Sequence, residues 1–249
     1  MKKTIKIILI IICLGVFLFS VYNIYNYLAE EYANKKLNDE LLEKAVVEVP
    51  YTNTDDTNTL ESENYSVPIS VDFSALKQEN KDIVGWIYSE NTSINYPVVQ
   101  SDDNEHYLRR LINGEYNIAG SIFMDYRSNP NLEDKNTIIY GHNMKNDTMF
   151  GSLQEYKSQE YYNNHKIIYY FTPEESYVLK LFAGCTVSVE SDIYTLSDIN
   201  TNDINKYKAQ SDFKCNVEIN EEDKILILST CAYEYEGARY IVMGVLDKL

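Results

Sequence analysis

The sequence of 249 residues is poor in glycine, proline and cysteine, with 9, 5 and 4 of them. So little glycine and proline excludes a collagen-like or low-complexity chain, and so little cysteine excludes a small disulfide-stapled scaffold. Basic residues are also scarce, since 22 Lys and Arg face 38 Asp and Glu. The net charge of −16 argues against a nucleic-acid partner, because phosphate binding needs a basic surface. With 45% hydrophobic residues, the chain can form one folded core plus an appendage.

An uncharged apolar run follows a cluster of lysines at the N-terminus. Lys2, Lys3 and Lys6 flank it, and residues 5–25 supply the roughly 20 mostly apolar residues that a membrane-spanning helix needs. A cleavable signal peptide would need a small-x-small site after the run, but Ser20 is the only small residue in positions 19–26. We therefore predict an uncleaved membrane anchor over residues 1–28. The lysines favour an N-terminus inside the cell, so the rest of this single-pass chain is expected on the extracellular face.

Behind the anchor, the pattern predicts two further regions. Residues 29–66 are expected to form a solvated stalk helix, up to about residue 47, and a polar linker over residues 50–66, which has no apolar period. Residues 67–249 are expected to form the folded domain.

Stretches rich in β-branched and aromatic residues dominate the predicted domain and indicate eight strands. These cover residues 86–88, 94–99, 121–124, 137–140, 166–171, 177–189, 225–230 and 239–246. Helical segments are predicted before the first strand, ending near Gly85, and over residues 103–111, 148–156 and 203–211. Many short strands with few helices predict a mainly β fold, a closed or nearly closed barrel.

Three cysteines remain outside the anchor, which holds Cys13. An odd number leaves at least one thiol that is free or paired with another chain, and a free thiol outside the cell is a candidate for chemistry. Cys185 lies in an apolar strand and Cys215 at the start of another predicted strand, where small buried thiols are typical. Cys231 instead ends the run KILILST and begins a polar loop, so its thiol would be held rigidly and still reach a substrate. No C-x-x-C or H-x-x-x-H spacing occurs, so no metal site is predicted.

A catalytic thiol needs a base or a cation nearby. His142 follows the apolar strand NTIIY and precedes a polar loop, whereas His106 and His165 lie in polar stretches typical of a surface. His142 is therefore the expected partner of Cys231, 89 residues later, if the fold brings them together.

Arg239 begins the last predicted strand, eight residues after Cys231. If these two strands form a hairpin, Arg239 returns beside the thiol and could stabilise an oxyanion. The alternative is an ordinary surface ion pair with Glu234 or Glu236.

Taken together, these segments resemble the sortase family. LSTC (228–231) is similar to the family's T-L-x-T-C signature with Ile227 in the first Thr position, YGHN (140–143) resembles the segment that carries the family His, and Arg239 falls where the family Arg falls. Four further segments resemble class B of this family: DFSALKQENKDIVGWI (72–87), INYPVVQ (94–100), GSIFMDYR (120–127) and NTIIYGHN (136–143). The resemblance covers residues 70–249.

The resemblance implies an eight-stranded sortase-like barrel with N-terminal helices and a helix in the connection before the strand that leads to Cys231. It implies a cysteine transpeptidase that recognises a sorting motif of the Asn-Pro-x-Thr-x kind near the C-terminus of secreted proteins. Cys231 would form a thioester with the Thr carbonyl, His142 would serve as acid and base, and Arg239 would hold the oxyanion or the substrate backbone. The acceptor would be an amine of a peptidoglycan precursor or cross-bridge, and no cofactor is implied.

The same resemblance implies that the groove for the sorting motif is lined by Asn95, Val99, Tyr140, Ile193, Tyr194 and Ser229. For Val99 and Ile193, packing in the core is an equally good interpretation. Two other functions stay open. One is a pilin-polymerising sortase or a hydrolytic cysteine protease at the cell surface, and the other is a non-enzymatic module that uses its 23 tyrosines for adhesion.

Overall fold

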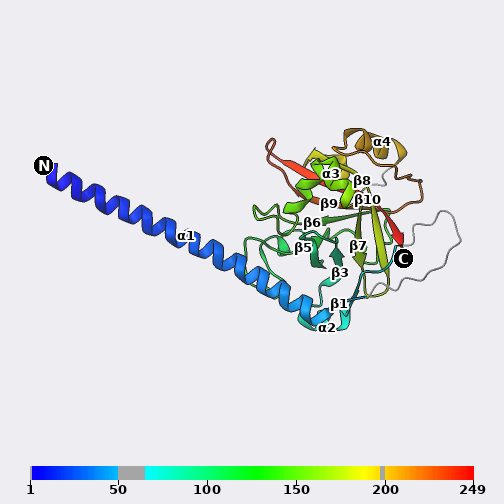
Figure 1. Cartoon of the computed structure of the whole chain (residues 1–249), viewed down its shortest axis with the longest axis horizontal. Helices are drawn as coiled ribbons and strands as arrows, with labels where there is room; N and C mark the ends of the chain where they lie inside the picture. The colour runs from blue at the N-terminus through cyan, green and yellow to red at the C-terminus, as the bar shows by residue number, and fades with distance from the viewer. Residues whose placement is uncertain (1, 50–64, 197–199) are drawn as a thin grey trace. The chain divides into compact units, whose positions relative to one another are not determined.

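The structure is a computed structural model that describes residues 2–49, 65–196 and 200–249 (Figure 1). The chain forms two compact units, Met1–Glu40 and Leu41–Leu249. Almost all of the predicted linker, residues 50–66, lies outside the described residues.

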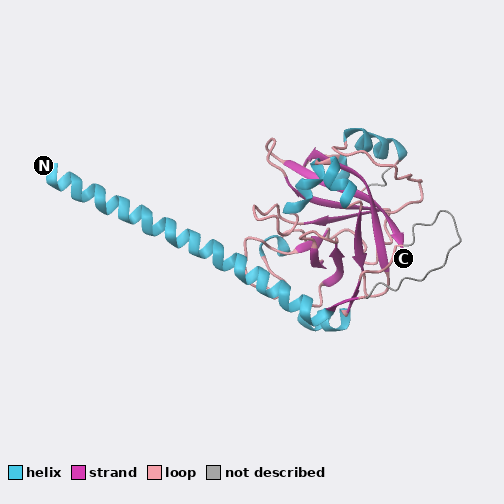
Figure 2. Ribbon diagram, viewed as in Figure 1, coloured by secondary structure: helices cyan, strands magenta, loops and turns pink. Residues whose placement is uncertain are grey.

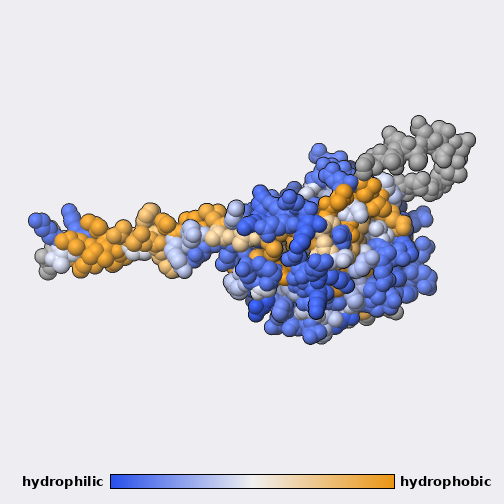
Figure 3. Space-filling model, turned by 90° about the horizontal axis from the view of Figure 1, so that it is seen from below, coloured by the Kyte–Doolittle hydropathy of each residue, from blue (hydrophilic) through white to orange (hydrophobic). Residues whose placement is uncertain are grey.

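Helix α1 (Lys2–Ala45) carries the apolar run of the N-terminus. Its large apolar side chains from Ile5 to Tyr25 are exposed, as the hydropathy colouring of Figure 3 shows. Among the described residues it is the one helix that is long and apolar enough to cross a membrane. An exposed apolar surface of this length suits a bilayer rather than water, so the helix fits a membrane anchor.

The last turns of α1 belong to the second unit and are not solvated. Leu41 and Ala45 are buried, with 3% and 2% of their surfaces exposed, so the prediction of a solvated stalk is wrong for this end of the helix. The two residues are four positions apart and therefore share one helix face, which the sequence shows without showing that a packing partner exists.

Eight strands close a barrel in the order β10-β8-β7-β3-β4-β5-β6-β9, which confirms the predicted mainly β barrel (Figure 2). The strands are β3 (Ile83–Tyr88), β4 (Asn95–Val99), β5 (Ile122–Met124), β6 (Asn136–Tyr140), β7 (Ile167–Phe171), β8 (Ser176–Ser188), β9 (Ile225–Cys231) and β10 (Ala238–Lys248). Within the barrel, β4 with β5 and β6 with β9 are parallel pairs, and the other neighbours are antiparallel. A separate two-stranded sheet pairs β1 (Val46–Glu48) with β2 (Ile69–Val71).

Helices fill the connections of the barrel. They are α2 (Phe73–Glu79), α3 (Gln159–Asn164), α4 (Thr201–Gln210) and the 3-10 turns η1 (His106–Arg109), η2 (Gly151–Lys157) and η3 (Asp192–Thr195). As predicted, α4 lies in the connection between β8 and β9, and Asn200 begins it with a capping box.

Two local predictions are wrong. The helix before the barrel ends at Glu79 rather than near Gly85, because Ile83 already belongs to β3. Cys215 lies in an irregular segment rather than at the start of a strand. The alternating residues that follow it resemble a strand, but Val217 contacts the outer apolar cluster from this segment, and its carbonyl accepts a hydrogen bond from Lys208 Nζ at 2.8 Å.

Both faces of β6, β9 and β10 are buried. Ile139, Leu228 and Val242 point into the cluster that fills the barrel, to which strands all around it contribute. Their chain neighbours Ile138, Ile227 and Ile241 belong to a second cluster, which Ile193 of η3 and Ile204 of α4 cover. Strands buried on both faces read as continuous apolar runs, which is why residues 225–228 show no alternation.

Candidate active site

Cys231 and Arg239 are directly opposite each other on neighbouring strands. Cys231 is the last residue of β9, Arg239 is the second residue of β10, and the antiparallel register pairs the two. Opposite residues of such a pair point to the same face with Cβ atoms about 5 Å apart. The hairpin expected from the sequence is therefore present, and it brings the guanidinium beside the thiol.

The guanidinium of Arg239 makes no ion pair with another described residue. Its Nη1 donates to the carbonyl of Ala238 at 2.9 Å, and the side chain is half-buried. Glu234, one of the two expected surface partners, pairs with Lys157 instead. An arginine held at a strand end in this way is available to a negatively charged or carbonyl oxygen.

Strand β6 runs parallel to β9 on the side away from β10, with Tyr140 opposite Ser229. Two hydrogen bonds continue this contact past the end of β6. The Gly141 N–H donates to the carbonyl of Ser229 at 3.1 Å, and Nδ2 of Asn143 donates to the carbonyl of Cys231 at 2.7 Å. His142 lies between these two bonds, so its backbone is level with Cys231 on the neighbouring strand.

The imidazole of His142 is half-buried, and its tautomer is fixed by one contact. Nε2 lies 2.7 Å from the carbonyl oxygen of Leu108, so this nitrogen carries the proton and donates it. Burial lowers the pKa of His142, the hydrogen bond to Leu108 raises it, the charge of Arg109 lowers it, and the net shift is downward. The ring is therefore neutral at pH 7, with Nδ1 as its proton acceptor.

Gly141 leaves room for two side chains that pack beneath His142. A Cβ at this position would lie 2.5 Å from Cδ1 of Ile122 and 2.7 Å from the ring of Phe150. Phe150 is fully buried, and its N–H donates to the carbonyl of His142 at 3.0 Å, so a displaced Phe150 would move His142 with it.

We expect Gly141→Ala to cost about 1–3 kcal/mol of unfolding free energy, as overpacking does, and to lower kcat through the shifted imidazole. Thermal unfolding and steady-state kinetics measure the two effects. Gly114→Asn is the control, because Gly114 has a left-handed φ of +84° that asparagine tolerates and open space around it. Wild-type stability and kcat in Gly141→Ala would contradict this account.

Three of the six residues expected to line a groove lie together beside Cys231. The hydroxyls of Tyr194 and Ser229 are 2.8 Å apart, and the rings of Tyr140 and Tyr194 are stacked with centroids 6.4 Å apart. Burial raises the pKa of Tyr194 to about 12, the Ser229 hydrogen bond and the charge of Arg239 lower it, and Cys231 raises it. Tyr194 is thus close enough to sense both reactive side chains.

The other three expected residues have different surroundings. Val99 is fully buried and Ile193 is 3% exposed within the outer apolar cluster, so their burial favours the packing interpretation. Asn95 begins β4, where its side-chain oxygen accepts a hydrogen bond from Nε1 of Trp86 at 2.7 Å.

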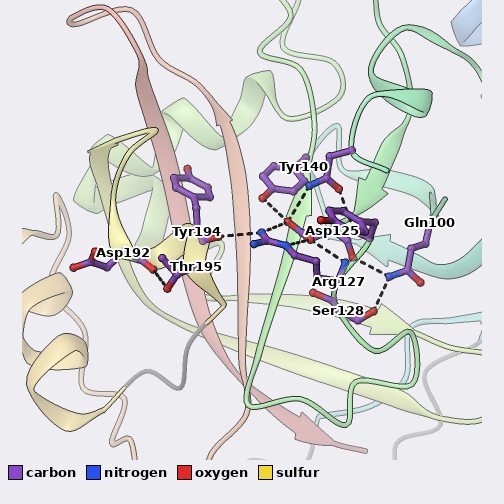
Figure 4. A network of polar contacts seen from close by, with 10 residues as sticks. Gln100, Asp125, Arg127, Ser128, Tyr140, Asp192, Tyr194 and Thr195 are labelled. Carbon is purple, nitrogen blue, oxygen red and sulfur yellow. Dashed lines mark hydrogen bonds and ion pairs between the residues drawn. The ribbon is translucent and has the colours of Figure 1, made fainter. Parts of the chain in front are cut away.

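A polar network beneath the groove was missed by the sequence analysis (Figure 4). Asp125, fully buried after β5, accepts two hydrogen bonds from the guanidinium of Arg127 and one from the hydroxyl of Tyr140 at 2.9 Å. The signal that could have indicated it is a charged pair two residues apart, D-Y-R, directly after an apolar strand.

All four thiols are free. Cys185 is buried, and burial, together with the charge of Asp212, raises the pKa of its thiol to about 12, against a smaller opposite effect of Lys206. The thiol of Cys215 donates to the carbonyl of Phe182 at 3.3 Å. Within the described part of the chain, no cluster of three or more His, Cys, Asp or Glu side chains could hold a metal ion. The hairpin thiol of Cys231 is therefore the one with a cation and an imidazole around it.

Comparison with known proteins agrees with this arrangement. The model of the family described as "Sortase domain" matches residues 87–247. The sortase B of Listeria monocytogenes is 36% identical over 244 residues, which cover 96% of this chain and 95% of that protein. The Staphylococcus aureus sortase B–substrate complex is 35% identical with a TM-score of 0.67, covering 71% of this chain and 85% of that one. The same enzyme complexed with triglycine is also 35% identical, with a TM-score of 0.66 and coverages of 71% and 86%.

A family model that covers most of the barrel and a relative similar over nearly the whole length agree with the class B segments of the sequence. This chain belongs to the sortase family of cysteine transpeptidases, in its class B.

Proposed function

We propose that this sortase cleaves an Asn-Pro-x-Thr-x type motif near the C-terminus of secreted proteins and transfers them to a peptidoglycan amine. The observation that supports the proposal most is the three-strand arrangement in which His142, Cys231 and Arg239 share one end of β6, β9 and β10. The Staphylococcus aureus relative has been seen with a substrate and with triglycine, a peptide with a free amine. We extend a peptide substrate and an amine acceptor to this chain by that analogy.

In the proposed first half-reaction, the Cys231 thiol passes its proton to Nδ1 of His142, and the sulfur attacks the carbonyl carbon of the motif Thr. The C–N bond to the next residue breaks as the imidazolium returns the proton to the leaving amine. The product is a thioester between Cys231 and the secreted protein.

The second half-reaction reverses these roles. The incoming amine attacks the thioester and gives its proton to neutral His142, the C–S bond breaks, and the proton returns to sulfur. Splitting one difficult exchange into two steps through a covalent intermediate is what allows an amine rather than water to be the final acceptor.

Arg239 is proposed to bind the oxygen of the tetrahedral intermediate. Removing one donor from such a site costs about 10²–10³ in kcat, so we expect this loss for Arg239→Ala with little change in KM. Arg239→Lys should recover part of kcat, because it keeps a charge but not the planar fork. Steady-state kinetics decide, with Lys248→Ala, an exposed cation near the other end of β10, as the control. Wild-type kcat in Arg239→Ala would contradict this role.

We assign the regions as an anchor over residues 1–28, a stalk and linker over residues 29–66 and a catalytic domain over residues 67–249, with the N-terminus inside and the domain outside the cell. An enzyme, a membrane-held substrate and a lipid-linked acceptor confined to one surface have a raised effective concentration. The apolar helix α1 supports this placement.

The nature of the product tests the proposal. The soluble domain is incubated with an Asn-Pro-x-Thr-x peptide library, with and without triglycine as the amine, and the products are weighed by mass spectrometry. We expect peptides that end in Thr joined to triglycine. Free acid as the sole product in the presence of amine would indicate the hydrolytic protease instead, and no cleavage of any peptide would refute the proposal.

A further inference from the structure

The turn η3 lies above Ser229 and is fastened at several points. Ile193 is buried in the outer apolar cluster, the Tyr194 hydroxyl contacts Ser229, and the carbonyl of Tyr194 accepts a hydrogen bond from Nη2 of Arg127 at 2.9 Å. The next residue but one, Leu196, has a left-handed φ of 55°. The last contact of Tyr194 joins the turn to the loop that connects β5 to β6.

Arg127 is itself fixed by a buried carboxylate. Its Nε and Nη2 each donate to an oxygen of Asp125 at 2.8 Å, which is the two-pronged geometry that only arginine provides. Burial raises the pKa of Asp125, but hydrogen bonds from Arg127, Tyr140 and Asn104 outweigh it, and the pKa lies below its ordinary value. Asp125 is therefore ionised at pH 7 and holds the guanidinium in one orientation.

Figure 4 shows Arg127 between the two halves of the groove. On one side, its carboxylate partner accepts a bond from the hydroxyl of Tyr140, and on the other side it binds the backbone of Tyr194. The rings of these two tyrosines stack beside Ser229. One guanidinium thus sets the spacing between two walls that belong to segments far apart in the sequence.

We propose that Arg127 is a positioning residue for the sorting-motif groove: by holding the Tyr194 carbonyl it keeps the Tyr194 phenol beside Ser229 and Cys231. Arg127 itself touches no reacting atom in this proposal. The inference rests on the proposed function, since it concerns how that same groove is shaped.

Arg127→Lys separates this role from a general contribution to folding. Lysine keeps a positive charge near buried Asp125, but its single ammonium cannot make the two-pronged contact and reach the Tyr194 carbonyl as well. We expect KM for the library peptide that the wild type cleaves fastest to rise about 10-fold, the loss expected for one charge-assisted hydrogen bond, with kcat within about 2-fold. The alkylation rate of Cys231 by iodoacetamide should not change. Arg110→Lys, the same exchange at an exposed arginine, is the control.

A double-variant comparison tests whether Arg127 acts through Tyr194. If it does, Arg127→Lys raises KM much less in a Tyr194→Phe background than alone, because the phenol hydroxyl is already lost. Should Arg127→Lys fail to fold, Asp125→Asn/Arg127→Gln removes both charges together and is measured in the same way. Full multiplication of the two effects, or a parallel fall of kcat and alkylation rate with unchanged KM, would overturn the proposal.

Amide hydrogen exchange gives a readout that needs no activity. We expect residues 192–196 to exchange faster in Arg127→Lys than in the wild type, with no change in β9 or β10. Unchanged exchange in η3 would overturn the positioning role even if no peptide were cleaved. Cleavage by the wild type combined with unchanged KM in Arg127→Lys would overturn it while leaving the proposed function intact.

Discussion

Replacing Cys231 with alanine is expected to abolish cleavage of Asn-Pro-x-Thr-x peptides while leaving the barrel folded. The substitution removes only the sulfur of a half-buried side chain at the end of β9, so little packing is lost. Loss of a covalent nucleophile costs at least about 10⁴-fold in kcat, because no other group can form the acyl intermediate. Peptide cleavage followed by chromatography measures the activity, and circular dichroism measures the fold.

Cys215→Ala provides the matched control for that experiment. Cys215 is another partly exposed thiol of the same domain, and it bonds to the carbonyl of Phe182 rather than to any part of the proposed site. It should keep most of the wild-type activity. Substantial cleavage by Cys231→Ala, or an equal loss in Cys215→Ala, would remove Cys231 from the mechanism.

Removal of the imidazole is the second large effect. His142→Ala should lower kcat about 10²–10⁴-fold, the usual contribution of a general acid and base, with the Cys231 thiol still present. The structure also fixes the direction of the pH dependence. Because burial lowers the pKa of His142, the acid limb of kcat/KM should fall below pH 6.5, the ordinary value for histidine.

The charge of Arg109 contributes to this lowered pKa after burial. Arg109→Gln removes a like charge near the imidazole, so the pKa of His142 should rise and the acid limb should move to higher pH. Arg110→Gln changes the same charge one residue away and should leave the limb where it is. An acid limb above pH 6.5 in the wild type, or no shift in Arg109→Gln, would show that His142 is not the group that titrates.

The sequence predicted the barrel because its strands leave local signals. The continuous apolar run at 225–228, a short polar loop and a second apolar run predict a hairpin, and the hairpin alone places Arg239 opposite Cys231. The parallel pairing of β6 with β9 leaves no such signal, because the two strands are separated by almost half of the barrel's chain. The partnership of His142 with Cys231 could therefore be predicted only through the resemblance to a family.

Features that depend on polar contacts across long distances were not predictable. The bond between Arg127 and the Tyr194 carbonyl spans 67 positions and has no periodicity that a sequence could reveal. For the same reason the sequence could not show that Leu41 and Ala45 of α1 find an apolar partner. The two local errors, at residues 80–85 and at Cys215, arose where apolar residues near a chain turn imitate the pattern of a different element.

The most direct test of the central claim is to weigh the acyl-enzyme. The soluble domain is mixed with a cleaved library peptide without any amine, quenched in acid, and digested for mass spectrometry. The account predicts that the peptide up to its Thr is attached to the tryptic fragment that contains Cys231, and that triglycine added before the quench removes it. Attachment to Cys185 or Cys215, or peptide cleavage without a covalent adduct or any transfer to triglycine, would contradict the account.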